Sequence, residues 1–288
     1  MPTKIFVLDK NIISLLNDDR PKESEAIKML QYIRRHDRKA YRFSALSSIM
    51  EGRLRRKETE EEIRNTITIE TKIMKKFFKN VKTDSEFFKN NNFKFAQVFS
   101  NNSVLINEQK YKAVIKKYYE RWDYYSKQGS IPKTEMAKFA YEIIEYVEEL
   151  KLPRENPIIL LLIIDIFQKT DSKFGKNQPW RILHPNKKIK DLEGKVHNVY
   201  SDLTVAHLLS RLNFAGRNEI SIQFLTLDNP LKNFLHVFEL NHQNIINLGF
   251  IDDSEIGLYI KSEVYSSFIL KFFEDYDQQK IVSENLAV

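Results

Sequence analysis

Short apolar runs, each followed by a helical pattern, stand at both ends of this chain, and they constrain its fold more than any other feature. Residues 4–9, 40–46 and 220–228 each predict a short buried strand, because they are apolar without strict alternation. Strands that alternate with helices are typical of a parallel sheet with helices on its faces. We therefore expect an α/β fold with a central parallel sheet, and helices at 22–36, 47–57, 201–212 and 229–238.

A long helical block separates the two strand-bearing parts. From about residue 58 to residue 170 the sequence is charged and helical in period, with Ile69, Ile73 and Phe77 recurring every four residues. An aromatic stripe at helical spacing predicts a second packed face, more simply core than a base-stacking surface. It consists of Ile115, Tyr118, Trp122 and Tyr125.

These patterns predict a discontinuous core. We expect its first part at 1–57, a large helical insertion at 58–180, its second part at 181–250, and a C-terminal helical extension at 251–288. Late in the chain, we expect a basic irregular loop at residues 173–195, a further strand at 241–250 and a continuous helix at 252–276.

Composition excludes several chemistries. The chain has no cysteine, which rules out disulfides and thiolate metal sites, and its seven glycines form no phosphate-binding loop or dinucleotide fingerprint. The longest apolar run, 157–167, is interrupted by Asp165 and is shorter than the roughly 20 residues that span a bilayer. We expect a cytoplasmic protein with no membrane partner. Its net charge of +7 fits a polyanionic partner.

Four acidic residues stand where predicted strands end or helices begin. They are Asp9 after the first strand, Glu51 in the first turn after the second strand, Asp202 at the start of a later helix, and Asp228 at the end of the last strand. Ligand sites of open parallel sheets form outside the carboxyl ends of the strands. We therefore expect these four carboxyl groups to converge, about 4–8 Å apart, within reach of a metal ion.

Clustered carboxylates repel one another unless a cation compensates them. Mg²⁺ and Mn²⁺ prefer oxygen ligands, and such an ion can activate water and neutralise charge on a scissile phosphate. Basic runs at 53–57 and 186–190, the first with Arg53, Arg55 and Arg56, could hold the phosphates of a nucleic acid. The six histidines have no ligand spacing typical of zinc.

Four segments carry a resemblance to a known family. "VLDKN" (7–11), "SALSSIMEGRL" (44–54), "YSDLTVAHLL" (200–209) and "FLTLDNPLKNF" (224–234) resemble the four acidic motifs of PIN-domain nucleases, in the order of that family. The last is the most telling, since a buried strand ends there in Thr226-Leu227-Asp228. The helical block between the second and third acids departs from compact members of the family.

The resemblance implies a three-layer PIN-like fold and a metal-dependent endonuclease. It implies that the four acids are catalytic metal ligands for Mg²⁺ or Mn²⁺, and that Asn11 and Thr226 are polar groups that orient ligands or substrate. It points to RNA before DNA as the substrate, in a toxin or defence setting. A second copy of the chain and a regulatory protein are open as further partners.

Each acid also has a structural alternative. Glu51 could belong to a capping box with Ser48, Asp202 could complement a helix dipole, and Asp9 and Asp228 could each cap the next helix. Asp165, in its apolar run, is expected to face a helix end or a basic partner. The alternative function is a catalytically inactive PIN-like protein that binds nucleic acid or acts as a scaffold, with the helical insertion as a docking surface for a partner.

Overall fold

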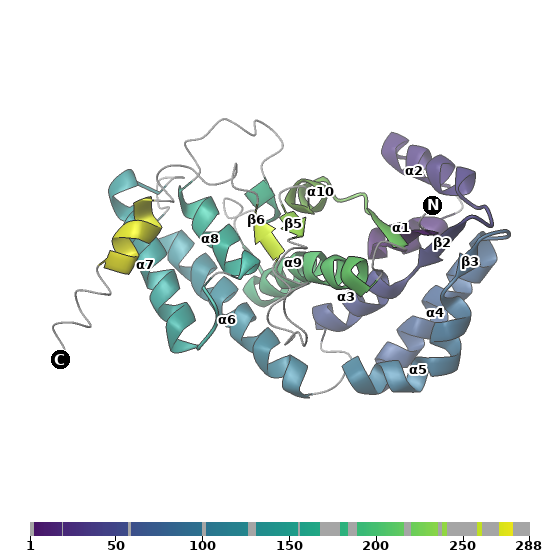
Figure 1. Ribbon diagram of the computed structural model, residues 1–288, viewed down its shortest axis with the longest axis horizontal. Helices are drawn as coiled ribbons and strands as arrows, with labels where there is room; N and C mark the ends of the chain where they lie inside the picture. The colour runs from purple at the N-terminus through teal and green to yellow at the C-terminus, as the bar shows by residue number, and fades with distance from the viewer. Residues whose placement is uncertain are drawn as a thin grey trace. The chain divides into compact units, whose positions relative to one another are not determined.

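The computed structural model is an α/β protein in which helices outnumber strands among the described residues (Figure 1). It describes residues 3–18, 20–56, 59–99, 102–125, 131–154, 156–167, 179–183, 189–215, 220–235, 238–240, 258–260 and 271–278. Its main sheet has four parallel strands, which confirms the expected fold class at this level. The strands are β1 (Thr3–Leu8), β2 (Tyr41–Ser44), β3 (Lys82–Thr83) and β4 (Ile220–Leu225).

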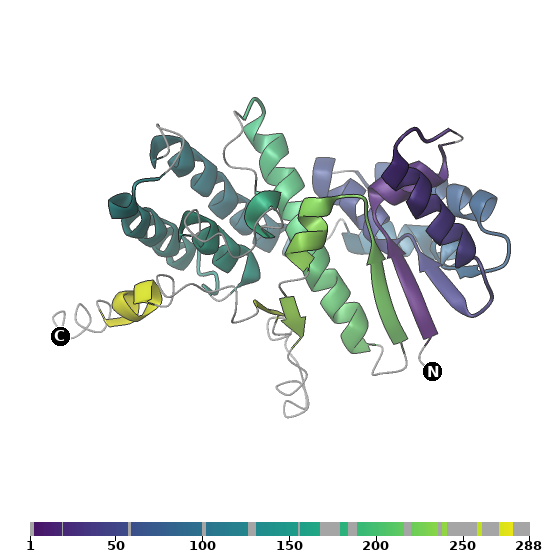
Figure 2. The same cartoon turned by 90° about the horizontal axis from the view of Figure 1, so that it is seen from above.

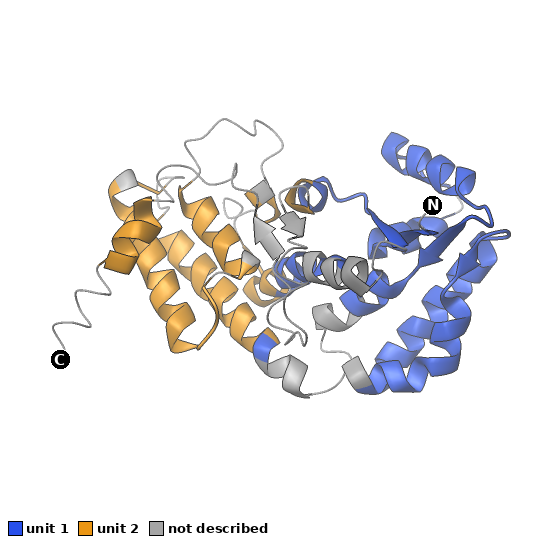
Figure 3. Ribbon diagram, viewed as in Figure 1, with its two compact units in different colours: residues 1–107, 197–232 blue, residues 108–196, 233–288 orange. Residues whose placement is uncertain are grey.

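The chain forms two compact units (Figure 3). Unit 1 comprises Met1–Asn107 and His197–Lys232, and unit 2 comprises Glu108–Val196 and Asn233–Val288. These bounds differ from the expected boundaries at 57 and 180. The first differs because residues 59–99 fold with the sheet. They supply β3 and two helices that pack on each other, α4 (Glu60–Phe77) and α5 (Ser85–Phe99).

The sheet order of unit 1 is β3-β2-β1-β4. The chain runs outward from β1 through β2 to β3, and it then returns to the other side of β1 for β4. Figure 2 shows β1 and β4 side by side, and their register pairs Thr3 with Ile220 and Leu8 with Leu225. The two strands therefore end together, and the residues that follow them leave the sheet at the same edge.

Helices α1 (Lys10–Leu16), α2 (Ser24–Arg35) and α3 (Leu46–Arg56) complete the core of unit 1. Helix α1 packs against α2, α3 and α4, and α3 packs on β1. The ring of Phe6 stacks on Phe43 with 4.7 Å between centroids, and the rings of Tyr32 in α2 and of His36, which follows α2, meet Phe6 edge-on. This core fixes β1 and the start of α1, and so it fixes the segment that carries Asp9.

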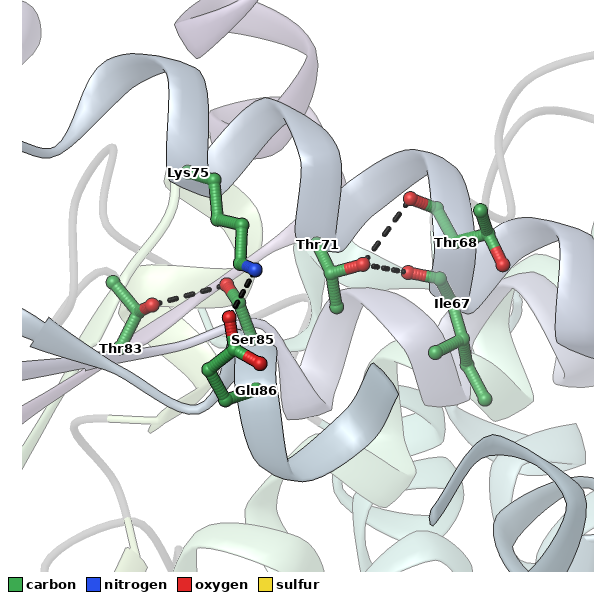
Figure 4. Close-up of polar contacts among 7 residues, drawn as sticks. All are labelled: Ile67, Thr68, Thr71, Lys75, Thr83, Ser85 and Glu86. Carbon is green, nitrogen blue, oxygen red and sulfur yellow. Dashed lines mark hydrogen bonds and ion pairs between the residues drawn. The ribbon is translucent and has the colours of Figure 1, made fainter. Parts of the chain in front are cut away.

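The buried face of helix α4 is centred on residues other than those that the sequence pattern singled out. The buried residues are Ile63, Ile67, Glu70, Thr71 and Met74, whereas Ile69 is 59% exposed. The predicted helical spacing is therefore only partly reflected in burial, since Ile73 and Phe77 are partly buried against the core and Ile69 is not. In Figure 4, Thr71 donates to the carbonyls of Ile67 and Thr68, and Lys75 pairs with Glu86 at the start of α5.

Unit 2 contains α6 (Asn102–Tyr125, from residue 108), α7 (Lys133–Glu149) and α8 (Pro157–Phe167). The predicted aromatic stripe is confirmed as core, since Tyr118 and Trp122 are 0% and 1% exposed. The ring of Tyr118 stacks on Phe139 at 5.7 Å between centroids. A short 3-10 turn, Pro179–Ile182, ends with Leu183, whose carbonyl accepts a hydrogen bond from Tyr119.

Several boundaries late in the chain differ from those expected. Helix α9 spans Leu192–Ala215, so the expected loop at 173–195 ends earlier than predicted, and α10 is Asn229–Leu235. Strands β5 (Phe238–Leu240) and β6 (Leu258–Ile260) pair antiparallel, which corrects the expectation of a continuous helix over 252–276. Residues 271–278 are helical, and the strand expected at 241–250 lies outside the described residues. In the described part of the chain, no helix combines the length and the apolar character needed to cross a membrane.

Candidate active site

The candidate site lies where β1 and β4 end. Because β2 and β3 lie on one side of β1 and β4 lies on the other, the strand order reverses between β1 and β4. Ligands of open parallel sheets bind at such a switch point, outside the carboxyl ends of the strands. Asp9 directly follows β1, and Thr226 directly follows β4. The backbone joins them as well, since the Asp9 N–H donates to the Leu225 carbonyl at 3.0 Å.

Asp9 is buried, with 6% exposure, and both of its carboxylate oxygens accept hydrogen bonds. Oδ1 accepts the backbone N–H of Lys10 at 2.8 Å. Oδ2 accepts the side-chain amide of Asn11 at 2.6 Å and the hydroxyl of Thr226 at 2.5 Å. Asp9 therefore connects the start of α1 to the segment after β4.

Thr226 is the centre of this network, and it is 1% exposed. Its hydroxyl donates to Asp9 and accepts from Asn11 Nδ2 and from the backbone N–H of Asp228, both at 3.0 Å. A hydroxyl has one donor and two acceptor positions, so Thr226 uses its full capacity. Asn11 Oδ1 also accepts the Leu227 N–H at 3.1 Å, which fixes the orientation of its amide.

Asp228 joins the network through its backbone and caps α10 with its side chain. Oδ1 accepts the Leu231 N–H at 2.8 Å, and the Asp228 carbonyl accepts the Lys232 N–H at 3.0 Å. Oδ2 accepts no hydrogen bond from the residues that the structure describes. The structural alternatives for Asp9 and Asp228 are thus realised, since each is a helix cap. Both residues also bond to the Thr226 hydroxyl, Asp9 through its carboxylate and Asp228 through its backbone N–H. Capping does not require these two contacts.

Glu51 is buried, with 6% exposure, but it does not form the expected capping box. Helix α3 begins at Leu46, so Glu51 lies in its second turn and not in the first turn, as the sequence suggested. The Leu46 N–H is instead served by the Ser44 hydroxyl at 3.2 Å, and the Ser48 hydroxyl meets no hydrogen-bond partner among the described residues. Capping therefore does not explain why this carboxyl is buried.

Asp202 is half-buried near the middle of α9. The expectation that it starts a helix was wrong, because α9 begins ten residues earlier at Leu192. The helical pattern continues upstream through Val196 and Val199, which are both buried. A position in the third turn is too far from the helix start for the macrodipole to account for an acid there.

All four acids belong to unit 1, and the network joins Asp9, Asn11, Thr226 and Asp228. Across the described ranges, no three acidic or histidine side chains are arranged to hold a metal ion. A carboxylate offers about four acceptor positions, of which Asp9 uses three. One position at Asp9 and Oδ2 of Asp228 are therefore available to a cation. The ligand set of four acids stays a prediction.

The basic run at 53–57 is only partly described. The backbone of Arg53, Arg55 and Arg56 belongs to α3, but their side chains lie outside the described residues, as does 186–188 of the second basic run. Their expected role in holding phosphates stays a prediction.

Sequence reasoning missed two acids near this edge, Glu70 and Asp84. Glu70 of α4 is 1% exposed and forms an ion pair with Lys10. The sequence contains a signal for this residue, because Glu70 interrupts the apolar spacing of Ile63, Ile67 and Met74 on the buried face of the helix. A charged residue on an apolar face requires a partner.

Asp84 follows β3, whose two residues are too few to show a period in the sequence. It accepts the Ala45 N–H at 3.2 Å, so it connects the end of β3 to the start of α3. Burial raises the pKa of Asp84 to about 6, and the negative charge of Glu70 adds to this effect, while hydrogen bonds from Ser44 and Ala45 oppose it. Asp84 is thus within electrostatic reach of Glu70.

Asp165 of unit 2 was expected to face a helix end or a basic partner. In the described part of the chain it accepts a hydrogen bond from the hydroxyl of Tyr118, and the expected helix end or basic partner stays a prediction. Both side chains are buried, at 2% and 0% exposure. The pair belongs to unit 2 and does not contribute to the candidate site.

Comparisons of this chain with family models, with curated proteins and with solved structures found no match.

Proposed function

We propose that the protein is a metal-dependent endonuclease of PIN-like type that hydrolyses phosphodiester bonds, with RNA as its preferred substrate. One observation supports this most: Thr226 holds Asp9 and the backbone of Asp228 together, at the switch point of a parallel sheet. The three-layer PIN-like arrangement and the choice of RNA rest on the motif resemblance. The net charge of +7 agrees with a polyanionic substrate.

The residues present fit a hard divalent cation such as Mg²⁺ or Mn²⁺, because they offer carboxylate oxygens. Asp9 and Asp228 would hold it, with Glu51 and Asp202 as the further predicted ligands. When bound, the cation supplies an activated water and neutralises charge on the phosphate. The buried position of Glu51 supports its assignment, since capping does not account for it.

The polar residues of the network keep Asp9 in place. Asn11 and Thr226 both donate to Oδ2 of Asp9, so this oxygen cannot rotate away without losing two hydrogen bonds. Such partners of a ligating carboxylate orient it and tune its charge. Asn11 and Thr226 thus act on the reaction through Asp9.

A specific observation also favours the alternative of an inactive PIN-like binding protein. Three of the acceptor positions of Asp9 are already used within the fold. A carboxylate that serves only as a cap and a bridge would have this environment. In that case the protein would bind nucleic acid without cleaving it.

The test is cleavage of labelled RNA and DNA by the purified protein, with Mn²⁺ or Mg²⁺ and with EDTA. We expect metal-dependent cleavage of RNA that Asp9→Asn abolishes, while RNA binding persists. The matched control is Asp37→Asn, an acid of unit 1 whose carboxylate caps backbone N–H groups before β3 and which should cleave normally. Equal cleavage by wild type and the Asp9 variant would remove the nuclease assignment, and binding without cleavage by wild type would favour the alternative.

A further inference from the structure

An ion pair next to the candidate site is unequally exposed. Lys10 follows Asp9 and is the first residue of α1, and its ammonium group pairs with the carboxylate of Glu70 in α4. The Glu70 side chain is 2% exposed, whereas the Lys10 side chain is 34% exposed. The pair therefore joins a partly exposed lysine side chain to a buried carboxylate.

The pair of Glu108 and Lys112 in unit 2 provides a comparison. There both side chains are buried, at 6% and 10% exposure. A buried pair of that kind satisfies its own charges, and burial of two ions contributes little net stability. Lys10 differs because about a third of its side chain is exposed, so that a ligand can approach it from solvent.

Lys10 is also fixed at the candidate site by its backbone. Its N–H donates to Oδ1 of Asp9 at 2.8 Å, so the residue cannot move independently of that carboxylate. Burial raises the pKa of Asp84, which follows β3, and the negative charge of Glu70 adds to this larger effect. Glu70 therefore acts electrostatically on the same edge of the sheet. The ammonium of Lys10 has three donors, and the contact with Glu70 requires only one of them.

We propose that Lys10 binds a backbone phosphate of the nucleic acid at the candidate site, and that Glu70 is the residue that positions it. This proposal rests on the proposed function and assigns the side chain that holds the substrate next to Asp9. The buried Glu70 restricts the rotamers of Lys10, so that less entropy is lost when the phosphate binds. Lys10 supplies a positive charge among several acids, where a polyanion would otherwise be repelled.

The test removes both charges together, because Lys10→Met alone would leave a buried carboxylate without this partner and could unfold the protein. The variant is K10M/E70Q in the binding-competent Asp9→Asn background, and the probe is labelled single-stranded RNA. Binding is measured by fluorescence anisotropy from about 50 to about 200 mM salt. The slope of log Kd against log salt should fall by about 0.7, the value for one phosphate on a single strand. At the lowest salt, binding should weaken about tenfold.

Two controls separate phosphate binding from a structural role. E108Q/K112M removes the buried pair of unit 2, and its salt slope should equal that of the parent. K10R keeps the positive charge and should keep the slope. In the cleavage-competent background, K10M/E70Q should raise KM and leave kcat nearly unchanged, because the contact is made before and during the reaction.

The outcomes of the two proposals are distinguishable. An unchanged salt slope in a folded K10M/E70Q variant of a protein that cleaves RNA would overturn the role of Lys10 and leave the nuclease function intact. A wild-type protein that neither binds nor cleaves nucleic acid would overturn both. A reduced slope without cleavage by wild type would support Lys10 as a phosphate-binding residue in the inactive alternative.

Discussion

Asp9 combines two roles that the sequence presented as alternatives. One carboxylate oxygen accepts the Lys10 N–H at the start of α1, and the other accepts Asn11 and Thr226. Capping alone requires only the first of these contacts. The second set joins two segments that are more than 200 positions apart in the chain, as the Asp9–Thr226 separation of 217 shows. The residue is therefore a cap and a part of the candidate site at once.

Thr226→Val tests the hydrogen bonds of the hydroxyl, because it removes this group and keeps the shape of the side chain. Valine fills the same volume but leaves Asp9, Asn11 and the Asp228 N–H each without one partner. We expect the free energy of unfolding to fall by about 1–3 kcal/mol, as measured by urea denaturation. Cleavage should fall as well, because Asp9 is no longer oriented. Thr226→Ser keeps the hydroxyl and should stay near wild type; equal losses in both variants would contradict the role of the hydrogen bonds.

Asp84 makes stability depend on pH in a defined direction. Its pKa is raised from 3.8 to about 6 by burial and by Glu70, so the folded state prefers the protonated form. Its stabilising contribution is complete below pH 3.8 and is lost as pH rises through about 6. The loss is at most about 3 kcal/mol, from about 1.4 kcal/mol per unit of pKa.

Asp84→Asn should remove this dependence, since an amide can still accept the Ala45 N–H but does not ionise. The measurement is thermal unfolding of both proteins between about pH 4 and about pH 7. The variant should gain stability relative to wild type as pH rises. Parallel curves across this range would show that Asp84 does not titrate there.

At the scale of the elements, the same local pattern occurs twice with different results. Thr59-Glu60-Glu61-Glu62 forms a complete capping box at the start of α4, whereas Ser48-Ile49-Met50-Glu51 does not. The difference is where the helix begins. Strand β2 ends at Ser44, and that hydroxyl serves the Leu46 N–H, so α3 starts before Ser48 is reached. A motif predicts a cap only when the preceding element ends in the right place.

The carboxylate of Asp37 also caps backbone N–H groups, at the opposite edge of the sheet, just before β3 begins. Its carboxylate accepts three successive backbone N–H groups, from Lys79 at 3.0 Å, Asn80 at 3.0 Å and Val81 at 2.9 Å, and so ties the segment before β3 to the end of α2. Burial acts to raise the pKa of Asp37, but the hydrogen bonds outweigh it and the net pKa is lowered from 3.8.

Asp37→Asn should lower the free energy of unfolding by about 1–2 kcal/mol, because a single amide oxygen replaces two charged acceptors. Since the pKa in the folded state is depressed, the contribution of Asp37 is present above pH 3.8 and is lost as pH falls further. The difference between wild type and variant in thermal unfolding should thus shrink toward acid pH. A difference that is constant with pH would exclude the charged interaction.

Much of the sheet follows from the sequence because three of its strands lie in apolar runs that are long enough to be recognised. The strands β1, β2 and β4, helix α3 after β2 and helix α10 after β4 were predicted within a few residues. Strand β3 was not, since two residues carry no period and its pairing depends on β2. The segment with Asp9, Asn11 and Thr226 was predicted, but the ion pair of Lys10 with Glu70 depends on how α4 packs against α1.

At the scale of the whole molecule, the chain forms two compact units with separate cores. Unit 1 contains the sheet and the candidate site, and unit 2 contains the aromatic core of α6, α7 and α8. Every residue of the hydrogen-bond network between Asp9 and Asp228 comes from unit 1. A substitution confined to the core of unit 2 should therefore act on stability and not on the contacts of the site.

Tyr118→Phe tests this separation. Tyr118 donates to the buried Asp165, and the phenylalanine ring keeps the stacking on Phe139 while it removes the donor. We expect the free energy of unfolding of unit 2 to fall by about 1–3 kcal/mol, since a buried charged acceptor loses a partner. Metal-dependent cleavage per folded molecule, measured well below the melting temperature, should equal that of wild type. A loss of cleavage in the fully folded variant would show that unit 2 contributes to the reaction, because no contact of Tyr118 that the structure describes belongs to unit 1.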